Sequence, residues 1–116
     1  MQSKPAGQIR VFSLKPEKDI QDVFSKGKKY GNQYSVLYCK NNAKHCIRAG
    51  VFVPKKVFKK AVDRNRAKRI IREVIRQGKN GLQSLDMIYV LKKCRREEVS
   101  LEFFRRQIAP LLRKAR

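Results

Sequence analysis

The chain is short and strongly basic. Its 116 residues suit one domain with one modest hydrophobic core. Hydrophobic residues make up 41% of the chain, which excludes a merely disordered basic tail. Lys and Arg number 30 against 9 Asp and Glu, and the formal net charge of +21 is typical of proteins that bind a polyanion.

The first elements are expected to be an arm, an extended piece and a helix. Residues 1–8 carry Pro5 and Gly7 and are predicted to form a flexible arm ahead of one domain over residues 9–116. A short extended piece over 9–14 leads to a helix that starts behind Pro16, with acidic residues in its first turn, and stops at Gly27. The apolar stripe of this helix consists of Ile20, Val23 and Phe24.

The remaining pattern predicts strands and helices in alternation. Strands are expected over 34–40 and 47–53, and the turn-forming residues 41–44 suggest that the two form a hairpin. A helix over 63–77, a buried strand over 85–91 and a helix over 100–114, weakened near its end by Pro110, complete the chain. This order indicates an α+β fold, a single-domain α/β sandwich with about four strands and three helices.

The predicted helix over 63–77 has one apolar side and two basic edges. Ala67, Ile70, Ile71, Val74 and Ile75 share the side that should pack on the sheet. One edge is a row spaced four residues apart, formed by Arg64, Lys68, Arg72 and Arg76, and the other edge holds Arg66 and Arg69. The planar guanidinium of Arg binds phosphate through two hydrogen bonds at once, so this helix is predicted to contact nucleic-acid phosphates.

The connection before this helix adds further positive charge, from Lys55, Lys56, Lys59 and Lys60. A helix face that is only solvated would pair its bases with acids four residues away. Between residues 55 and 79 the only acids are Asp63 and Glu73, too few for such pairing. Contact with RNA or DNA is therefore the favoured interpretation.

Aromatic residues suggest a second surface, because bases of single-stranded RNA stack on aromatic side chains in basic grooves. Tyr34, Val36 and Tyr38 alternate onto one strand face, opposite Leu37 and Cys39. The alternation of side chains along the strand does not decide which of its two faces is open to solvent. The two tyrosines are explained equally well as half-buried packing residues. Phe24 lies on an apolar stripe, so periodicity alone places it in the core.

The basic segment contains a long motif. Its residues Lys55-Lys56, Lys59-Lys60-Ala61, Arg64-Asn65-Arg66, Lys68-Arg69 and Arg72-Glu73 resemble the RNR signature of the bacterial ribonuclease P protein family. The surrounding order also fits, with Val23-Phe24, Val36-Leu37-Tyr38, Arg48 and Gly50-Val51 before the signature, and an apolar strand from Asp86 to Lys92-Lys93 after it. The resemblance extends over roughly residues 9–114.

The resemblance implies a function beyond general polyanion binding. In this family a catalytic RNA with bound magnesium removes the 5′ leader of precursor tRNA, and the protein binds the RNA and the leader. The implied partners are that RNA and precursor tRNA, with one protein monomer per RNA and magnesium held mainly by the RNA. The implied fold has a left-handed crossover, which the general preference for right-handed crossovers would not suggest.

Residue roles follow from the matched positions. The resemblance gives RNA-facing roles to Arg64, Asn65, Arg66, Lys68, Arg69 and Arg72, with Lys55 and Lys56 as the leading pair and Lys59, Lys60 and Arg76 beside them. Phe24 and Tyr38 match aromatic positions of a leader cleft, which is expected to include Ile20, Tyr34 and Val36. Ile20 replaces a Phe common in the family, and the family's basic N-terminal string is reduced to Arg10 and Lys15.

The sequence predicts no active site within the protein. Protein-based phosphodiester hydrolysis needs clustered carboxylates for magnesium or a His acid/base pair. The chain has one His, its acids are scattered, and Glu97-Glu98 is expected to be a solvated pair. The favoured interpretation is thus an endoribonuclease subunit whose chemistry lies in RNA. The alternatives are a structural RNA-binding protein of the ribosomal type and a nonspecific nucleic-acid or membrane-surface binder.

The cysteines and the N-terminus set the expected compartment. Cys39, Cys46 and Cys94 are odd in number and lack CxxC spacing, so reduced thiols are expected. His45 beside Cys46 lacks a second ligand pair, so structural zinc is not expected. No run of 18 apolar residues and no apolar signal core are present, which predicts a cytoplasmic protein without a membrane partner.

Overall fold

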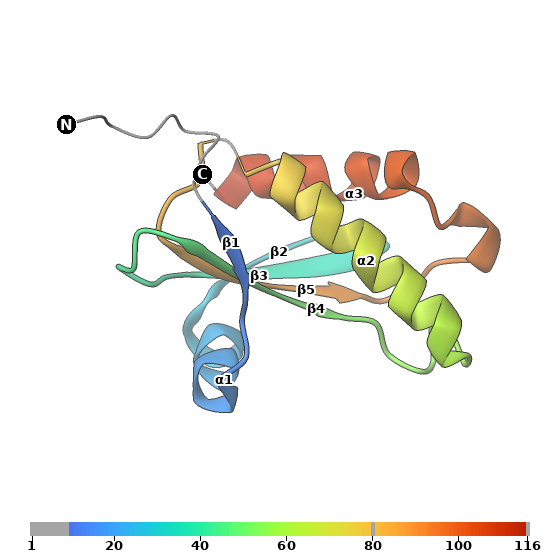
Figure 1. The fold of residues 1–116 in the computed structure, drawn as a ribbon, viewed down its shortest axis with the longest axis horizontal. Helices are drawn as coiled ribbons and strands as arrows, with labels where there is room; N and C mark the ends of the chain where they lie inside the picture. Colours follow the sequence, from blue (N-terminus) through green and yellow to red (C-terminus); the bar gives the residue numbers. More distant parts are fainter. Residues whose placement is uncertain (1–9, 80, 116) are drawn as a thin grey trace.

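A computed structural model describes residues 10–79 and 81–115 of the chain (Figure 1). Its elements in chain order are β1 (Val11–Ser13), α1 (Glu17–Lys26), β2 (Lys28–Gly31), β3 (Ser35–Asn41), β4 (Ile47–Phe52), α2 (Ala61–Gln77), β5 (Leu85–Leu91), the short 3-10 helix η2 (Arg96–Glu98) and α3 (Leu101–Ala115). The α+β class and the three predicted helices are confirmed. The predicted arm over 1–8 lies outside the described residues. Among the described helices none is long and apolar enough to cross a membrane.

The strands form one mixed sheet of five strands in the order β1-β4-β5-β3-β2. β5 lies between β3 and β4, antiparallel to the first and parallel to the second. The predicted hairpin between residues 34–40 and 47–53 is therefore wrong. The physical reason is the near-continuous apolar run of β5, which is buried on both faces and is best accommodated in the centre of the sheet.

The sheet has one strand more than the expected four or so, because β2 was not predicted. β2 is a polar segment of four residues, Lys-Lys-Tyr-Gly, with no alternation of apolar side chains. It is an edge strand that pairs only with β3, in antiparallel register from Lys28 with Cys39 to Gly31 with Val36. Because β2 pairs on one side only and its other edge faces solvent, its side chains can be polar and need not alternate with apolar ones.

The crossover from β4 through α2 to β5 joins two parallel strands. In Figure 1 both strands run to the right, β1 lies nearest the viewer, and α2 passes back above the sheet. β5 lies behind β4, on the side away from β1. This crossover is left-handed, as the family resemblance implied.

Helices cover the two faces of the sheet unequally. α2 and α3 lie above one face in Figure 1, over the main core, where Leu37, Met87 and Tyr89 are fully buried. α1 lies on the opposite face over a much smaller cluster of Leu14, Val23 and Ile88. The Leu37 face is thus the one that the larger core covers, and Tyr38 shares the other face with α1.

Local chemistry sets the ends of the helices. α1 ends at Gly27, where a Cβ would lie 2.5 Å from the carbonyl oxygen of Val23 and 2.9 Å from that of Cys39. Only glycine allows the chain to turn this closely into β2. Pro110 does not end α3, which continues to Ala115. The neighbouring Leu111 and Leu112 are buried in the main core and hold the last turns in place.

Candidate nucleic-acid interface

α2 separates apolar and basic side chains as predicted. Ala67, Ile71, Val74 and Ile75 are buried against the sheet and α3, and Ile70 is half-buried. The opposite arc carries the predicted RNA-binding residues of the helix, of which Asn65, Arg66, Arg69, Arg72 and Arg76 are exposed and Arg64 and Lys68 are half-buried. The helix therefore presents a continuous basic arc to solvent.

Two arginines of the signature are bonded to the protein's own backbone. Arg64 Nη1 donates to the carbonyl oxygens of Phe58 and Lys59 at 2.9 and 2.8 Å, which ties the start of α2 to the connection before it. Arg66 Nη2 donates to the carbonyl oxygen of Val99 at 3.3 Å, next to η2. The signature thus has a structural part, which the pattern of basic residues did not reveal.

Arg69 and Arg72 are the signature arginines most available to a ligand. Within the described part of the chain, neither makes an ion pair, and both are exposed. Arg76 differs, because it forms an ion pair with Glu73, and its hydrogen bond lowers the pKa of that carboxyl. The basic arc is therefore free in its middle and partly neutralised at its C-terminal end.

The lysine connection between β4 and α2 projects its charges into solvent. Lys55, Lys56, Lys59 and Lys60 are all exposed. Phe58 in their midst is buried in the main core, and its backbone N–H and that of Val57 donate to the carbonyl oxygen of Pro54. One buried aromatic ring and a tight turn thus hold the four ammonium groups on the outside of a defined loop.

An aromatic cluster lies on the other face of the sheet, beside α1. The Phe24 ring meets the Tyr38 ring edge-on at 4.9 Å and stacks on the Phe52 ring at 5.9 Å between centroids. Phe24 is 40% exposed and Phe52 36%, so both rings remain open to solvent. Lys29 Nζ lies 5.8 Å from the centre of the Tyr38 ring. Aromatic surface next to a cation is what stacking and phosphate binding of a single strand require.

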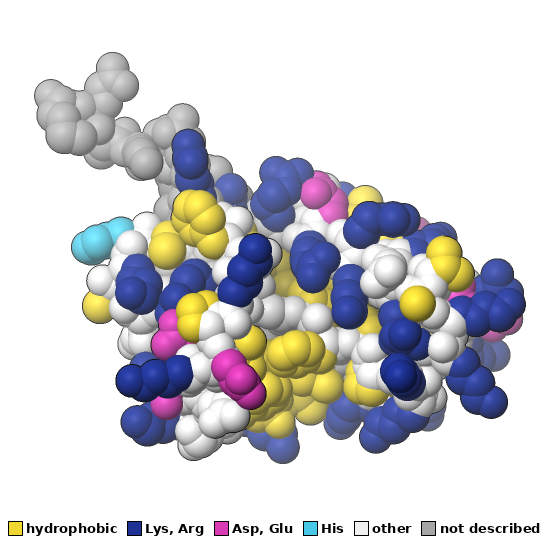
Figure 2. Space-filling view, turned by 60° about the horizontal axis from the view of Figure 1, so that its bottom comes forward, with side chains coloured by type: hydrophobic (Ala, Val, Ile, Leu, Met, Phe, Trp, Pro, Cys, Tyr) yellow, Lys and Arg dark blue, Asp and Glu magenta, His cyan; other side chains and the backbone are white. Residues whose placement is uncertain are grey.

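Figure 2 shows the face of the molecule on which α1 lies. Apolar side chains gather in its centre, and Lys and Arg side chains surround them. Acidic side chains are few on this face. The apolar area therefore has a mainly basic rim, with acidic side chains along one edge.

The predicted cleft residues do not all lie together. Ile20, half-buried on α1, packs in the same small cluster as Tyr38. Val36 is buried and contributes no open surface. The Tyr34 ring instead packs edge-on against Phe103 of α3 at 5.3 Å. Asn32 Oδ1 accepts the backbone N–H of Tyr34, and this turn holds Tyr34 just before β3 begins.

Sequence reasoning missed Phe52 as a member of the aromatic cluster. Strand parity carried the signal, because Phe52 alternates with Val51 and Val53, which are buried in the main core. Phe52 also ends β4, three residues before Lys55. The aromatic cluster therefore leads directly into the lysine connection.

No group of three or more His, Cys, Asp or Glu that could hold a metal ion occurs within residues 10–79 and 81–115. The three cysteines are free, and burial raises the pKa of the Cys39 thiol to about 12.

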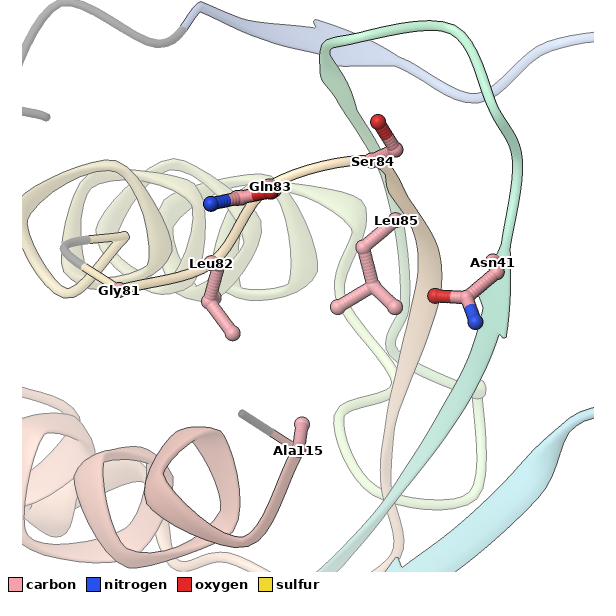
Figure 3. Close-up of a pocket in the computed structure, with 7 residues that line it drawn as sticks. All are labelled: Asn41, Gly81, Leu82, Gln83, Ser84, Leu85 and Ala115. Carbon is pink, nitrogen blue, oxygen red and sulfur yellow. The ribbon is translucent and has the colours of Figure 1, made fainter.

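A pocket of about 280 Å³ lies at the end of the sheet near the last turn of α3 (Figure 3). Leu82, Leu85 and Ala115 are among its lining residues, and none of the described residues that line it is titratable.

Comparison with known proteins places these features in a family. The family model described as Ribonuclease P matches residues 10–116. The Ribonuclease P protein component of Nitrosococcus oceani is 34% identical over 90 residues, covering 77% of this chain and 75% of its own length. That of Vibrio parahaemolyticus is 35% identical over 96 residues, covering 83% and 81%.

Solved structures show the same fold. The RNase P protein of Staphylococcus aureus superposes with a TM-score of 0.79 at 27% identity, covering 92% of this chain and 97% of its own. The RNase P protein of Thermotoga maritima gives a TM-score of 0.77 at 30% identity, covering 88% and 96%.

Proposed function

The chain belongs to the Ribonuclease P protein family, and on this premise we propose that it binds the catalytic RNA of ribonuclease P and the 5′ leader of precursor tRNA. The basic arc of α2 and the lysine connection would contact the catalytic RNA. The cluster of Phe24, Tyr38 and Phe52 would receive the leader. The family is that of the protein component of an endoribonuclease.

The observation that carries the proposal is the continuity of the two surfaces. β4 brings Phe52 into the aromatic cluster and leads within three residues to Lys55. An unpaired strand that leaves RNA bound to the lysine connection would therefore meet the aromatic rings next, on the face of the sheet opposite α2. A single strand without sequence preference is bound by such rings next to cations.

The hydrolysis itself is assigned to the RNA partner with its magnesium ions. The described carboxylates of this chain are engaged in ion pairs or stand apart, as with Asp19 and Asp86 on Arg48 and Glu73 on Arg76. The protein's part would be to bind and orient the substrate while supplying positive charge near the cleavage site. We expect one protein per RNA, acting in the bacterial cytoplasm.

Reconstitution tests the proposal. The protein is combined with a bacterial catalytic RNA, and cleavage of a precursor tRNA is measured at low magnesium with and without it. The expected result is cleavage that depends on the protein. Unchanged cleavage together with unchanged substrate affinity would contradict the proposal, and cofractionation with ribosomal subunits at high salt would favour a ribosomal-type binder.

A further inference from the structure

A guanidinium joins three elements on the α1 face. Arg48 of β4 donates from Nε and Nη2 to the two carboxylate oxygens of Asp86 on β5, at 2.7 and 2.6 Å. Its Nη1 donates to Asp19 Oδ2 on α1 at 3.0 Å. Asn42 Nδ2 also donates to Asp86, at 2.8 Å. Arg48 is thus fixed on the sheet by a bidentate pair, and its remaining nitrogen reaches the helix.

The chain entering α1 is tied to β4, since β1 pairs with β4 and the Leu14 N–H donates to the carbonyl oxygen of Ala49 at 3.0 Å. The apolar contacts of α1 are the small cluster of Leu14, Val23 and Ile88, with Ile20 and Tyr38 partly buried beside it. Its C-terminal end is fixed by the close packing of Gly27 against β3. Asp19 lies in the first turn, and its ion pair with Arg48 is a side-chain contact that joins this turn of the helix directly to the sheet.

The position of α1 decides the shape of the aromatic cluster. Phe24 lies five residues after Asp19, about 7.5 Å further along the helix axis. Without the ion pair, the first turn of α1 would be held to the sheet only by the small apolar cluster and by the chain from Leu14. A tilt of the helix would then shift Phe24 against Tyr38 of β3 and Phe52 of β4, which remain in the sheet.

We infer that Asp19 is a positioning residue, which holds α1 against the sheet through Arg48 and so keeps Phe24 in register with Tyr38 and Phe52 for binding the leader. The inference rests on the proposed function, since it assigns a role within the leader site. Asp19 itself would not touch the RNA.

The negative charge of Asp19 separates a positioning role from a general electrostatic effect, because the two predict opposite changes in binding when the charge is removed. A carboxylate near a polyanion repels it, so Asp19→Asn should strengthen RNA binding if general electrostatics alone acted. A positioning role predicts the opposite result, which is weaker binding of the leader. Arg48 keeps its bidentate partner Asp86 in this variant, and the Asp86 side chain is only 6% exposed, so the sheet should remain folded.

Asp22 provides a matched control. It lies on the same helix, carries the same charge, and makes no ion pair with another described residue. Asp22→Asn removes one negative charge and leaves the contact with Arg48 intact. Asp19→Glu keeps the charge and the ability to pair with Arg48.

The test measures the affinity of the reconstituted holoenzyme for precursor tRNA and for mature tRNA, with the wild-type protein and the three variants. Asp19→Asn should lower the ratio of the two affinities by about twofold to fivefold, as loss of a partly exposed ion pair allows. Asp22→Asn should match or exceed wild type, Asp19→Glu should recover most of the ratio, and affinity for the catalytic RNA should be unchanged throughout.

A second measurement reports on the helix directly. Amide hydrogen exchange of the free protein should be faster in α1 of Asp19→Asn, and unchanged in α2 and α3. An affinity ratio equal to that of Asp22→Asn, no recovery with Asp19→Glu, or exchange that rises throughout the protein would overturn the inference. If wild-type protein itself gives no preference for precursor, the proposed function fails instead.

Discussion

Arg64 and Arg69 are predicted to act differently although both belong to the RNR-type helix. Arg64 donates to two backbone carbonyls of the lysine connection, whereas Arg69 is exposed and makes no ion pair among the described residues. Arg64→Ala should therefore destabilise the fold, while Arg69→Ala should leave it intact and weaken RNA binding.

The magnitude follows from the lost contacts. A hydrogen bond to a charged group contributes about 1.5–3 kcal/mol, and the contact with Lys59 lies at the exposed surface, so we expect a total of about 1–2 kcal/mol. Ala and Arg have similar helix propensities, so the helix backbone offsets little of this. For a domain of this size such a loss lowers Tm by about 4–10 °C.

Thermal and urea unfolding of the two variants, followed by circular dichroism, give the comparison. For Arg69→Ala the expected change appears instead in RNA binding, where the slope of log affinity against log salt concentration should fall by about one. Equal stability of Arg64→Ala and Arg69→Ala would refute the anchoring role of Arg64. An unchanged salt slope for Arg69→Ala would refute its contact with phosphate.

Three further predictions concern the cleft and the fold. Phe52→Ala should reduce the holoenzyme's preference for precursor over mature tRNA by about tenfold, the value of one base–aromatic stack, and an unchanged preference would remove Phe52 from the leader site. Burial opposes ionisation of Asp86, but hydrogen bonds from Arg48 and Asn42 outweigh it and hold the pKa of that carboxyl below its usual range. This carboxylate therefore contributes stability above about pH 4 that is lost as the pH falls through the lowered pKa; urea unfolding between pH 3 and 7 should show the loss in wild type, and an Asp86→Asn variant with an identical profile would contradict it. Gly27→Ala should lower Tm strongly, because the added Cβ meets two carbonyl oxygens, and a Tm equal to wild type would show that the turn can shift.

The sequence predicted the helices well because their apolar stripes are long and periodic. α1 and α2 begin within two residues of the expected positions, and β5 matches its predicted range. The pairing of strands was not predictable in the same way. Turn residues between β3 and β4 favoured a hairpin, whereas the order of strands depends on β5, which arrives later in the chain and is buried on both faces.

The basic residues of the candidate site could be predicted from the sequence, but the contacts that these residues make could not. Composition and spacing identified the basic arc of α2, but not that Arg64 and Arg66 bond to backbone carbonyls. The contacts of Arg64 depend on the conformation of the connection just before α2, and the contact of Arg66 depends on Val99, which is distant in sequence. The same holds for Tyr34, which a turn directs toward Phe103, and for Phe52, whose neighbours on α1 are distant in sequence.

The central claim is that the protein adds a binding site for the leader to a catalyst made of RNA. Its most direct test is the affinity for precursor and mature tRNA, measured with the catalytic RNA alone and with the holoenzyme. We expect the protein to strengthen binding of the precursor and to leave binding of mature tRNA nearly unchanged. An equal gain for both tRNAs would contradict this claim, because the protein would then act as a general source of positive charge.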